Sequence, residues 1–271
     1  MNLRAQTRLS LEKDLHRALD NDEFLIYYQP RFHIPSGKVI AMEALVRWQH
    51  PKKGVIPPEK FLAVAEETSL ILPLGKQMMR KACKDYESWL SAGLTVPRIA
   101  INLSEKEFNS RELLGNVKSV LSETRLQPSS LELELTEKIF AGDVQSTLHT
   151  LDKLQDVGVH LCIDDFGTGY SSLSKLNHTP IRTIKIDRSF ISNICSNDDD
   201  ATTIAAIIAM ANTLKLDIVA EGVETRAQME LLSRLGCHTM QGYYFSRALQ
   251  PDDVPGLLAA EMDEQPRLYS L

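Results

Sequence analysis

The chain has 271 residues, of which 43% are hydrophobic and 24% are charged, and its formal net charge at pH 7 is -6. This length and composition predict a globular protein with a sizeable core, and one barrel of about 250 residues fits them better than two small domains. The acidic balance argues against binding to long nucleic acid, which relies on a basic surface. A small phosphate ligand stays possible, because it needs only a local cluster of cations.

The cysteines and the start of the chain bear on its location. Cys83, Cys162, Cys195 and Cys237 lie far apart and form no CxxC pair, so we expect buried thiols and neither a zinc site nor a disulfide framework. The opening MNLRAQTRLSLEKDLHRAL is charged and lacks the apolar run of a signal peptide. No stretch of about 18 apolar residues follows, so we expect no membrane segment and a cytoplasmic protein.

The first predicted element is a helix over residues 7–20. Leu11, Leu15, Ala18 and Leu19 recur there at helical spacing, and Ser10 is a candidate cap. Eight apolar or alternating runs then predict strands: FLIYYQP (24–30), VIAMEALVRW (39–48), RIAINLS (98–104), LELELTEKI (131–139), VHLCIDDFG (159–167), TIKIDRSF (183–190), DIVAEGVE (217–224) and TMQGYYFS (239–246).

Helical patterns separate most of these strands, and regular alternation of strand and helix predicts parallel pairing. The first two strands are joined by HIPSGK (33–38), which is too short for a crossover helix, so they should form an antiparallel hairpin. The fold class is therefore α/β, a modified TIM (β/α)8 barrel with an antiparallel first strand pair and an N-terminal helix. We expect a helix or linker over 1–20, the barrel over 21–262 and a tail over 263–271.

Polar residues interrupt strands that should be apolar on both faces. Asn102, Glu134, Lys185 and Asp187 alternate with aliphatic residues, so in a barrel they point inward near the C-terminal mouth. Further acids stand at or near other strand ends: Glu43, Asp164, Asp165 and Glu221. Crowded carboxylates either protonate or recruit cations, and hard oxygen ligands favour Mg²⁺ or Mn²⁺, with two ions expected. The competing interpretation is that these acids form surface salt bridges and helix caps.

Several motifs occur in a fixed order along residues 10–260. They are YQP (28–30), EALVR (43–47), NLS (102–104), ELTE (134–137), DDFGTGYSSL (164–173), KID (185–187), AEGVE (220–224) and QGYYFS (241–246). Together they resemble the EAL family of cyclic di-GMP phosphodiesterases, and eight ordered motifs are far more specific than one tripeptide. The resemblance implies metal-dependent hydrolysis of cyclic di-GMP to linear 5′-pGpG in bacterial second-messenger signalling.

The resemblance also implies roles for individual residues. Glu43, Asn102, Glu134 and Asp164 match ligands of one metal, Asp164 and Asp165 help to hold the second, and Glu221 is a ligand, water-orienting group or general base. Lys185 matches the lysine that positions the attacking water, and Asp187 orients Lys185 or waters of the second ion. Gln29, Arg47 and Gln241, with Asp187, form the implied substrate-binding set. Glu137 matches a glutamate that steadies the DDFGTGYSSL loop and couples dimerisation to metal binding.

The implied cofactors are Mg²⁺ or Mn²⁺, with Ca²⁺ inhibitory, because its larger and looser coordination shell disturbs a two-ion site. The implied partners are cyclic di-GMP, a second copy of the chain in a homodimer, and an upstream sensory or GGDEF-type domain.

Three alternatives stay open at this point. The chain could be a non-catalytic cyclic di-GMP sensor, although its matched residues are intact. Lys185 could be the Schiff-base lysine of an aldolase, although its acidic neighbours oppose the required loss of a proton. Paired acids also suit a glycosidase, although five carboxylates exceed the two that such an enzyme needs and only two tryptophans are present.

Overall fold

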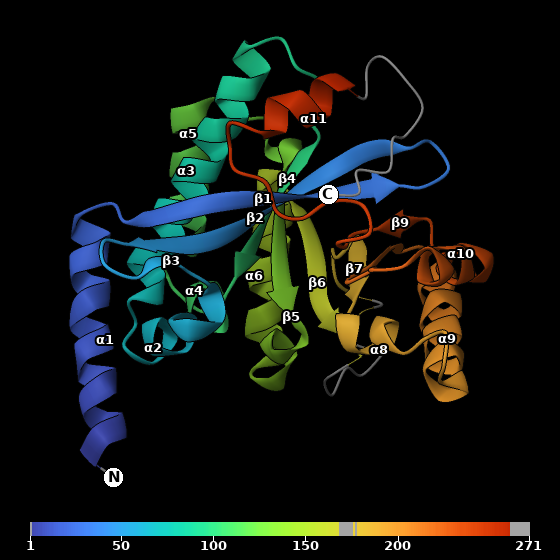
Figure 1. The fold of residues 1–271 in the computed structure, drawn as a ribbon, viewed down its shortest axis with the longest axis horizontal. Coiled ribbons are helices and arrows are strands. Elements are labelled where there is room, and N and C mark those ends of the chain that lie inside the picture. The colour runs from blue at the N-terminus through green and yellow to red at the C-terminus, as the bar shows by residue number, and fades with distance from the viewer. Residues whose placement is uncertain (1, 168–175, 177, 261–271) are drawn as a thin grey trace.

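The strands of the chain close into a barrel (Figure 1). The computed structural model describes residues 2–167, 176 and 178–260, with only the backbone for residues 2–7. The described strands are β1 (Phe24–His33), β2 (Lys38–His50), β3 (Gly54–Ile56), β4 (Arg98–Leu103), β5 (Leu131–Thr136), β6 (His160–Phe166), β7 (Thr183–Ile186), β8 (Asp217–Ala220) and β9 (Thr239–Met240). All except β3 belong to the barrel, which closes because β1 pairs with both β2 and β9.

Strand β1 is antiparallel to both of its neighbours, and the other neighbouring barrel strands run parallel. The predicted α/β barrel with an antiparallel first strand pair and an N-terminal helix is therefore confirmed. Strand β3 was not predicted; it pairs with the end of β2 beyond the barrel, where Trp48 lies opposite Ile56.

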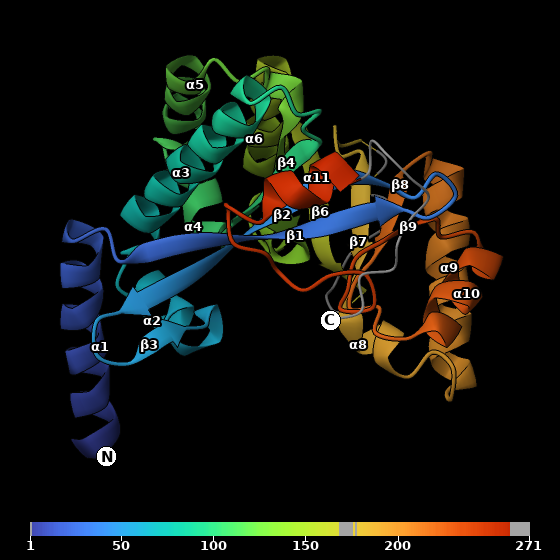
Figure 2. The same cartoon turned by 45° about the horizontal axis from the view of Figure 1, so that its top comes forward.

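Helices cover the outside of the barrel. They are α1 (Asn2–Asp20), α2 (Leu62–Glu67), α3 (Ile71–Ser91), α4 (Glu105–Phe108), α5 (Leu113–Thr124), α6 (Val144–Val157), α8 (Arg188–Ser192), α9 (Asp198–Leu214), α10 (Arg226–Leu235) and α11 (Val254–Ala260). Short 3-10 turns occupy Pro58–Lys60, Pro128–Ser130 and Glu137–Ala141. Figure 2 shows α3, α5 and α6 along one flank and α9 and α10 along the other. Among the helices that the structure describes, none combines the length and apolarity that a membrane crossing requires.

The two faces of strand β5 have opposite character. Leu131, Leu133 and Leu135 of β5 are fully buried against the surrounding helices, as period-2 alternation requires. Glu132 and Glu134 alternate with them and are also buried, so they point into the barrel. The apolar core thus lies between barrel and helices, while the interior of the barrel contains charge, which proteins bury only when it is paired.

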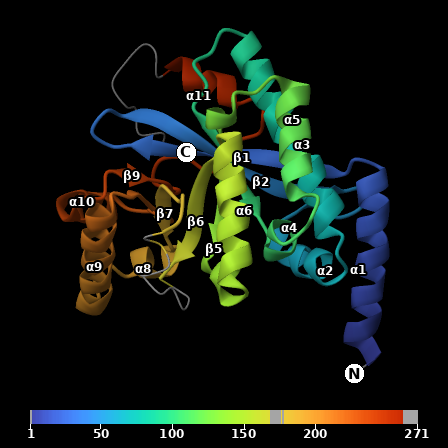
Figure 3. The same ribbon diagram turned by 180° about the vertical axis from the view of Figure 1, so that it is seen from behind.

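Helix α1 stands at one edge of the molecule, with its N-terminal end directed away from the barrel (Figure 3). Its C-terminal half is buried at Leu15 and Ala18, and the helix packs against α2. Beyond the helix, Glu23 accepts a hydrogen bond from Trp48 Nε1 at 3.0 Å. The helix begins at Asn2, so Ser10 lies within it and the predicted cap at Ser10 is wrong.

Further predictions were wrong. The strands predicted over LELELTEKI, TIKIDRSF and DIVAEGVE end earlier, at Thr136, Ile186 and Ala220. The strand predicted over TMQGYYFS ends at Met240, because the chain turns at Gly242 against Val223. A Cβ atom at Gly242 would lie 2.1 Å from the carbonyl oxygen of Val223, so only glycine permits this approach. Cys83, Cys162 and Cys237 are buried as expected, whereas Cys195 is exposed.

Candidate functional site

Five carboxylates meet at the C-terminal mouth of the barrel. Glu43 comes from β2, Glu134 from β5, Asp164 and Asp165 from β6, and Glu221 from the residue that follows β8. They form two groups, in each of which the ligating oxygens lie within 4.8 Å of one another. One group is Glu43, Glu134 and Asp164, and the other is Asp164, Asp165 and Glu221. Asp164 therefore belongs to both groups.

A break in the β6 ladder brings the two adjacent aspartates to the same site. The register between β6 and β7 shifts between Ile163 and Phe166, and Asp165 has a left-handed φ of 53°. Consecutive residues of a regular strand point to opposite faces, and a bulge is the usual way to redirect one of them. The irregularity therefore lets Asp164 and Asp165 face the same acidic group. Asp165 tolerates this conformation better than most residues.

Lys185 lies at the centre of the acids and has no solvent exposure. Its Nζ is 2.5 Å from Glu134 Oε2 and 2.6 Å from Glu221 Oε1. It also lies 3.2 Å from Asp164 Oδ1 and 3.4 Å from Glu43 Oε2. These neighbours outweigh burial and raise the pKa of Lys185 well above its usual value, so the ammonium stays charged.

Among the hydrogen bonds and ion pairs of the described residues, none joins Asp187 to Lys185, and its role toward Lys185 stays a prediction. The Asp187 carboxylate caps helix α8, accepting hydrogen bonds from Ser189 N at 3.0 Å and Ser189 Oγ at 2.5 Å. Asp187 nevertheless lies close enough to Asp165 to raise the pKa of that carboxyl. The residue therefore acts at the second acidic group and at the start of α8.

Amide side chains orient Glu43. Asn102 Nδ2 donates to Glu43 Oε1 at 2.7 Å, and Gln241 Nε2 donates to Glu43 Oε2 at 2.5 Å. Gln241 Nε2 also lies 3.2 Å from Gln29 Oε1, and Gln29 Nε2 donates to the Ser246 carbonyl at 3.1 Å. Because the amide nitrogen of Asn102 faces Glu43, its oxygen is the atom that Asn102 can offer to a cation.

The acids differ strongly in proton affinity. Burial would raise the pKa of Glu43, but Lys185 and the amide donors hold it at about 2. Burial raises the pKa of Glu221 to about 8, and Lys185 only partly offsets it. Burial and Asp164 raise the pKa of Asp165 to about 6, while burial and Glu43 raise that of Glu134. The charge of Lys185 does not balance the five carboxylates, which favours recruitment of cations.

A pocket of about 210 Å³ opens beside the acids. It is lined by Gln29, Glu43, Leu45, Arg188, Glu221, Gly222, Glu224, Gln241, Gly242 and Tyr243. Tyr243 is 56% exposed, and the guanidinium carbon of Arg247 lies 4.5 Å from the centre of its ring. Sequence reasoning did not single out Arg188 or Tyr243. Both follow a predicted site residue by one or two positions, so their proximity to Asp187 and Gln241 was the available signal.

Arg47 and Glu137 lie outside this pocket. The guanidinium of Arg47 donates to the Val46 carbonyl at 2.8 Å and lies 5.6 Å from the Tyr27 ring centre. Buried Glu137 accepts a hydrogen bond from Gly167 N at 3.1 Å, so it holds the start of the DDFGTGYSSL segment. Residues 168–173 of that segment lie outside the described residues.

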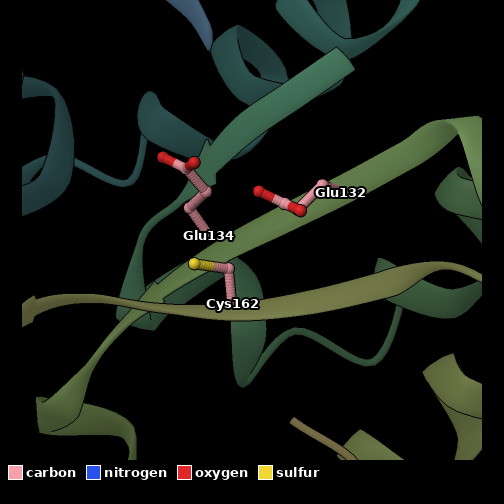
Figure 4. A group of neighbouring side chains, drawn as sticks. All are labelled: Glu132, Glu134 and Cys162. Atoms are coloured by element: carbon pink, nitrogen blue, oxygen red, sulfur yellow. The ribbon is translucent and has the colours of Figure 1, made fainter. Parts of the chain in front are cut away.

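A third group of ligating side chains lies inside the barrel. Figure 4 shows Glu132 and Glu134 leaving β5 and Cys162 leaving the neighbouring β6. Arg31 of β1 reaches both glutamates, at 2.7 Å from Glu132 Oε1 and 2.5 Å from Glu134 Oε1. Sequence reasoning missed Arg31 and Glu132. The signal was their spacing, since each lies two residues along a strand from a predicted site residue, Gln29 or Glu134.

The barrel and its acidic mouth define a known class of protein. The model of the EAL domain family matches residues 12–248, and the chain belongs to this family.

Two curated relatives come from Pseudomonas aeruginosa. The chain is 43% identical over 254 residues to the bifunctional diguanylate cyclase/cyclic di-GMP phosphodiesterase MucR, covering 94% of this chain and 37% of MucR. It is 40% identical over 270 residues to the cyclic di-GMP phosphodiesterase NbdA, covering 99% of this chain and 34% of NbdA. The chain thus spans about a third of the length of these relatives.

A solved structure is similar over almost its whole length. It is the PaMucR phosphodiesterase in complex with c-di-GMP, with 42% identity and a TM-score of 0.87. The similarity covers 90% of this chain and 99% of that one.

Proposed function

We propose that the chain hydrolyses cyclic di-GMP to linear 5′-pGpG in bacterial second-messenger signalling. The observation that carries the proposal is the division of five carboxylates into two groups that share Asp164, next to a pocket at the barrel mouth. Similarity to MucR and NbdA, both named as cyclic di-GMP phosphodiesterases, supports the choice of substrate. The c-di-GMP complex of the PaMucR phosphodiesterase supports it further.

The donor set fits two hard divalent cations. Glu43, Glu134, Asp164 and the Asn102 oxygen would hold one ion, and Asp164, Asp165 and Glu221 would hold the other. Carboxylate and amide oxygens without histidine or cysteine favour Mg²⁺ or Mn²⁺. When bound, such a pair of ions neutralises the phosphate and lowers the pKa of the attacking water.

The residues of the chain bind and orient the reactants. Water attacks phosphorus and the 3′ oxygen leaves, so one P–O bond forms and one breaks. Lys185 stays protonated and stabilises the negative charge that develops on the phosphoryl oxygens. Glu221, which lies 2.6 Å from Lys185, orients the water or accepts its proton.

The pocket offers groups that suit a guanine nucleotide. Arg188 lies on the pocket wall and supplies positive charge for a phosphate, and the exposed ring of Tyr243 can stack on a base. Gln29 and Gln241 line the same wall. Arg47 lies on the same strand as Glu43, beyond the pocket, where it would contact a part of the substrate that extends outward.

Product analysis tests the proposal. The chain is incubated with cyclic di-GMP and Mg²⁺ or Mn²⁺, with and without EDTA, and the products are separated by chromatography. We expect pGpG to form, EDTA to abolish its formation, and Ca²⁺ to inhibit it. Glu43→Ala should be inactive, while Glu230→Ala, an exposed change on α10, serves as the matched control. Binding without turnover would identify a sensor and contradict the proposal.

Assembly is a separate part of the proposal. We infer a homodimer, coupled to the acidic site through Glu137 and the DDFGTGYSSL segment, whose Gly167 N donates to Glu137. An upstream sensory or GGDEF-type domain would join through helix α1, in line with a boundary near residue 20. The barrel would then span 21–262 and a tail 263–271. Light scattering of the chain with and without substrate tests the dimer.

A further inference from the structure

Arg31 is the feature of the barrel interior that the proposed reaction does not use. It comes from β1, is 2% exposed, and spans two layers of charge inside the barrel. Its Nη1 atom donates to Glu132 Oε1 at 2.7 Å, and its Nη2 atom donates to Glu134 Oε1 at 2.5 Å. A planar guanidinium can bridge two carboxylates in this way, whereas a lysine ammonium is a single point charge.

The two oxygens of Glu134 have different partners. Arg31 binds Oε1, while Oε2 lies 2.5 Å from Lys185 Nζ at the acidic mouth. Glu134 thus belongs to two groups. We call the group with Glu43 and Asp164, at the barrel mouth, the upper group. The group with Glu132 and Cys162, deeper in the barrel, is the lower group (Figure 4). The guanidinium neutralises the lower group and directs one oxygen of Glu134 to the upper group.

We propose that Arg31 is a positioning residue that commits Glu134 to bind a divalent cation at the mouth through Oε2 alone. The inference rests on the proposed function, because it needs a metal site at the mouth. Partners that orient a metal ligand typically contribute a factor of about 10 to 100 in metal affinity. Arg31 contacts this ligand directly, so its loss should weaken metal binding before it affects contacts with the nucleotide.

Arg98 provides a matched control. Its Nη1 atom donates to Glu132 Oε2 at 2.9 Å, so it contacts the same lower glutamate as Arg31. No contact between Arg98 and Glu134 occurs among the hydrogen bonds and ion pairs of the described residues. A variant at Arg98 therefore disturbs Glu132 without releasing Glu134.

The experiment measures Mn²⁺ binding by calorimetry on the wild-type chain and on Arg31→Met, Arg31→Lys and Arg98→Met. For Arg31→Met we expect Mn²⁺ affinity to fall by a factor of about 10 to 100. Arg31→Lys should recover part of this loss, and Arg98→Met should stay within about threefold of the wild type. In turnover assays kcat at limiting Mn²⁺ should fall for Arg31→Met, excess Mn²⁺ should restore part of it, and KM for cyclic di-GMP should change little.

A further variant guards against misfolding. Arg31→Met leaves Glu132 buried with Arg98 alone, so Arg31→Met/Glu132→Leu removes both buried charges together. Replacing a buried ion pair by apolar residues is often neutral for stability. The folded double variant should show the same loss of Mn²⁺ affinity as Arg31→Met.

Two outcomes show whether the positioning role of Arg31 fails alone or fails together with the proposed function. Wild-type affinity for Mn²⁺ in Arg31→Met, or in the folded double variant, would overturn the positioning role and leave the proposed function intact. A wild-type chain that binds no Mn²⁺ would overturn the proposed function, and this inference with it.

Discussion

Gln241 donates a hydrogen bond from Nε2 to Glu43 Oε2 at 2.5 Å, although 198 residues separate the two along the chain. The contact joins the residue after the last barrel strand to an acid on the second strand, and it can form only when the barrel closes. Glu43 is therefore held from both sides, since Asn102 donates to its other oxygen at 2.7 Å. Closure of the barrel therefore helps to orient Glu43.

The first prediction concerns this contact. Gln241→Leu should weaken Mn²⁺ binding by a factor of about 10 or more, because Glu43 loses a donor that orients one of its oxygens. The measurement is a calorimetric Mn²⁺ titration. Gln29→Leu removes a neighbouring amide but leaves the bond between Gln241 and Glu43, so it should bind Mn²⁺ like the wild type. Equal losses in the two variants would contradict the prediction.

The second prediction concerns the number of ions. Asp164 belongs to both acidic groups, whereas Asp165 belongs to one of them. Asp164→Asn should therefore remove tight binding of both ions, and Asp165→Asn should remove one. Electron paramagnetic resonance of Mn²⁺ titrations counts them, with two expected for the wild type. Turnover should fall by a factor of about 1,000 or more in Asp164→Asn, because phosphoryl transfer depends on electrostatic stabilisation.

Much of this architecture could be predicted from the sequence. Alternation placed Glu134 and Lys185 inside a barrel because their aliphatic neighbours needed the other face. The short connection HIPSGK specified the antiparallel first pair. The last strand was predicted too long, because the contact between Gly242 and Val223 depends on two distant loops.

Contacts across the closed barrel could not be predicted. Arg31 and Glu132 lie 101 residues apart, and nothing local in β1 says which acid its guanidinium will meet. Asp187 caps helix α8, which begins at Arg188. The strand predicted over TIKIDRSF included these residues, so the cap was not predicted. Periodicity gives the face on which a residue lies, but its partner depends on register and closure.

The third prediction concerns the backbone conformation of Asp165, separately from its carboxylate. Its φ of 53° is left-handed, a conformation that costs most residues about 1 kcal/mol or more and glycine little. Asp165→Gly should therefore be more stable than Asp165→Ala. Both variants lack the carboxylate that Asp165 contributes to the second acidic group. Urea denaturation without divalent ions measures the difference. A more stable alanine variant would contradict it.

The fourth prediction concerns Lys185, which offsets the charge of four neighbouring acids. Lys185→Met should lower the free energy of unfolding by about 3 kcal/mol without divalent ions, because it leaves buried carboxylates without their cation. Mg²⁺ should stabilise this variant more than the wild type, since it supplies the missing charge. Thermal unfolding with and without Mg²⁺ tests this. In turnover assays kcat should fall by a factor of about 100 while KM changes little.

The fifth prediction concerns Glu107, which lies outside the acidic mouth and belongs to the capping box of α4. Its carboxylate accepts from Ser104 N at 3.0 Å and Ser104 Oγ at 2.5 Å. It also packs so close to α3 that a Cβ atom at Gly75 would lie 1.6 Å from its Oε1. Burial raises the pKa of Glu107 to about 7, although the bonds from Ser104 oppose this.

A raised pKa in the folded state means that the buried group favours folding while it is protonated. This contribution is complete below the ordinary value of 4.5 and is lost as the pH rises through about 7. Glu107→Gln keeps an acceptor for the capping box and cannot ionise. The wild type should therefore lose stability relative to this variant between pH 5 and pH 8, by up to about 3 kcal/mol.

Urea denaturation at several pH values measures the free energy of unfolding of the wild type and of Glu107→Gln. The other acids titrate alike in both proteins, so their contribution cancels in the difference. Glu105→Gln, an exposed change on the same helix, should show no such trend. Parallel stability curves for the wild type and Glu107→Gln would mean that Glu107 is ionised throughout. The capping bonds from Ser104 would then outweigh the cost of burying the charge.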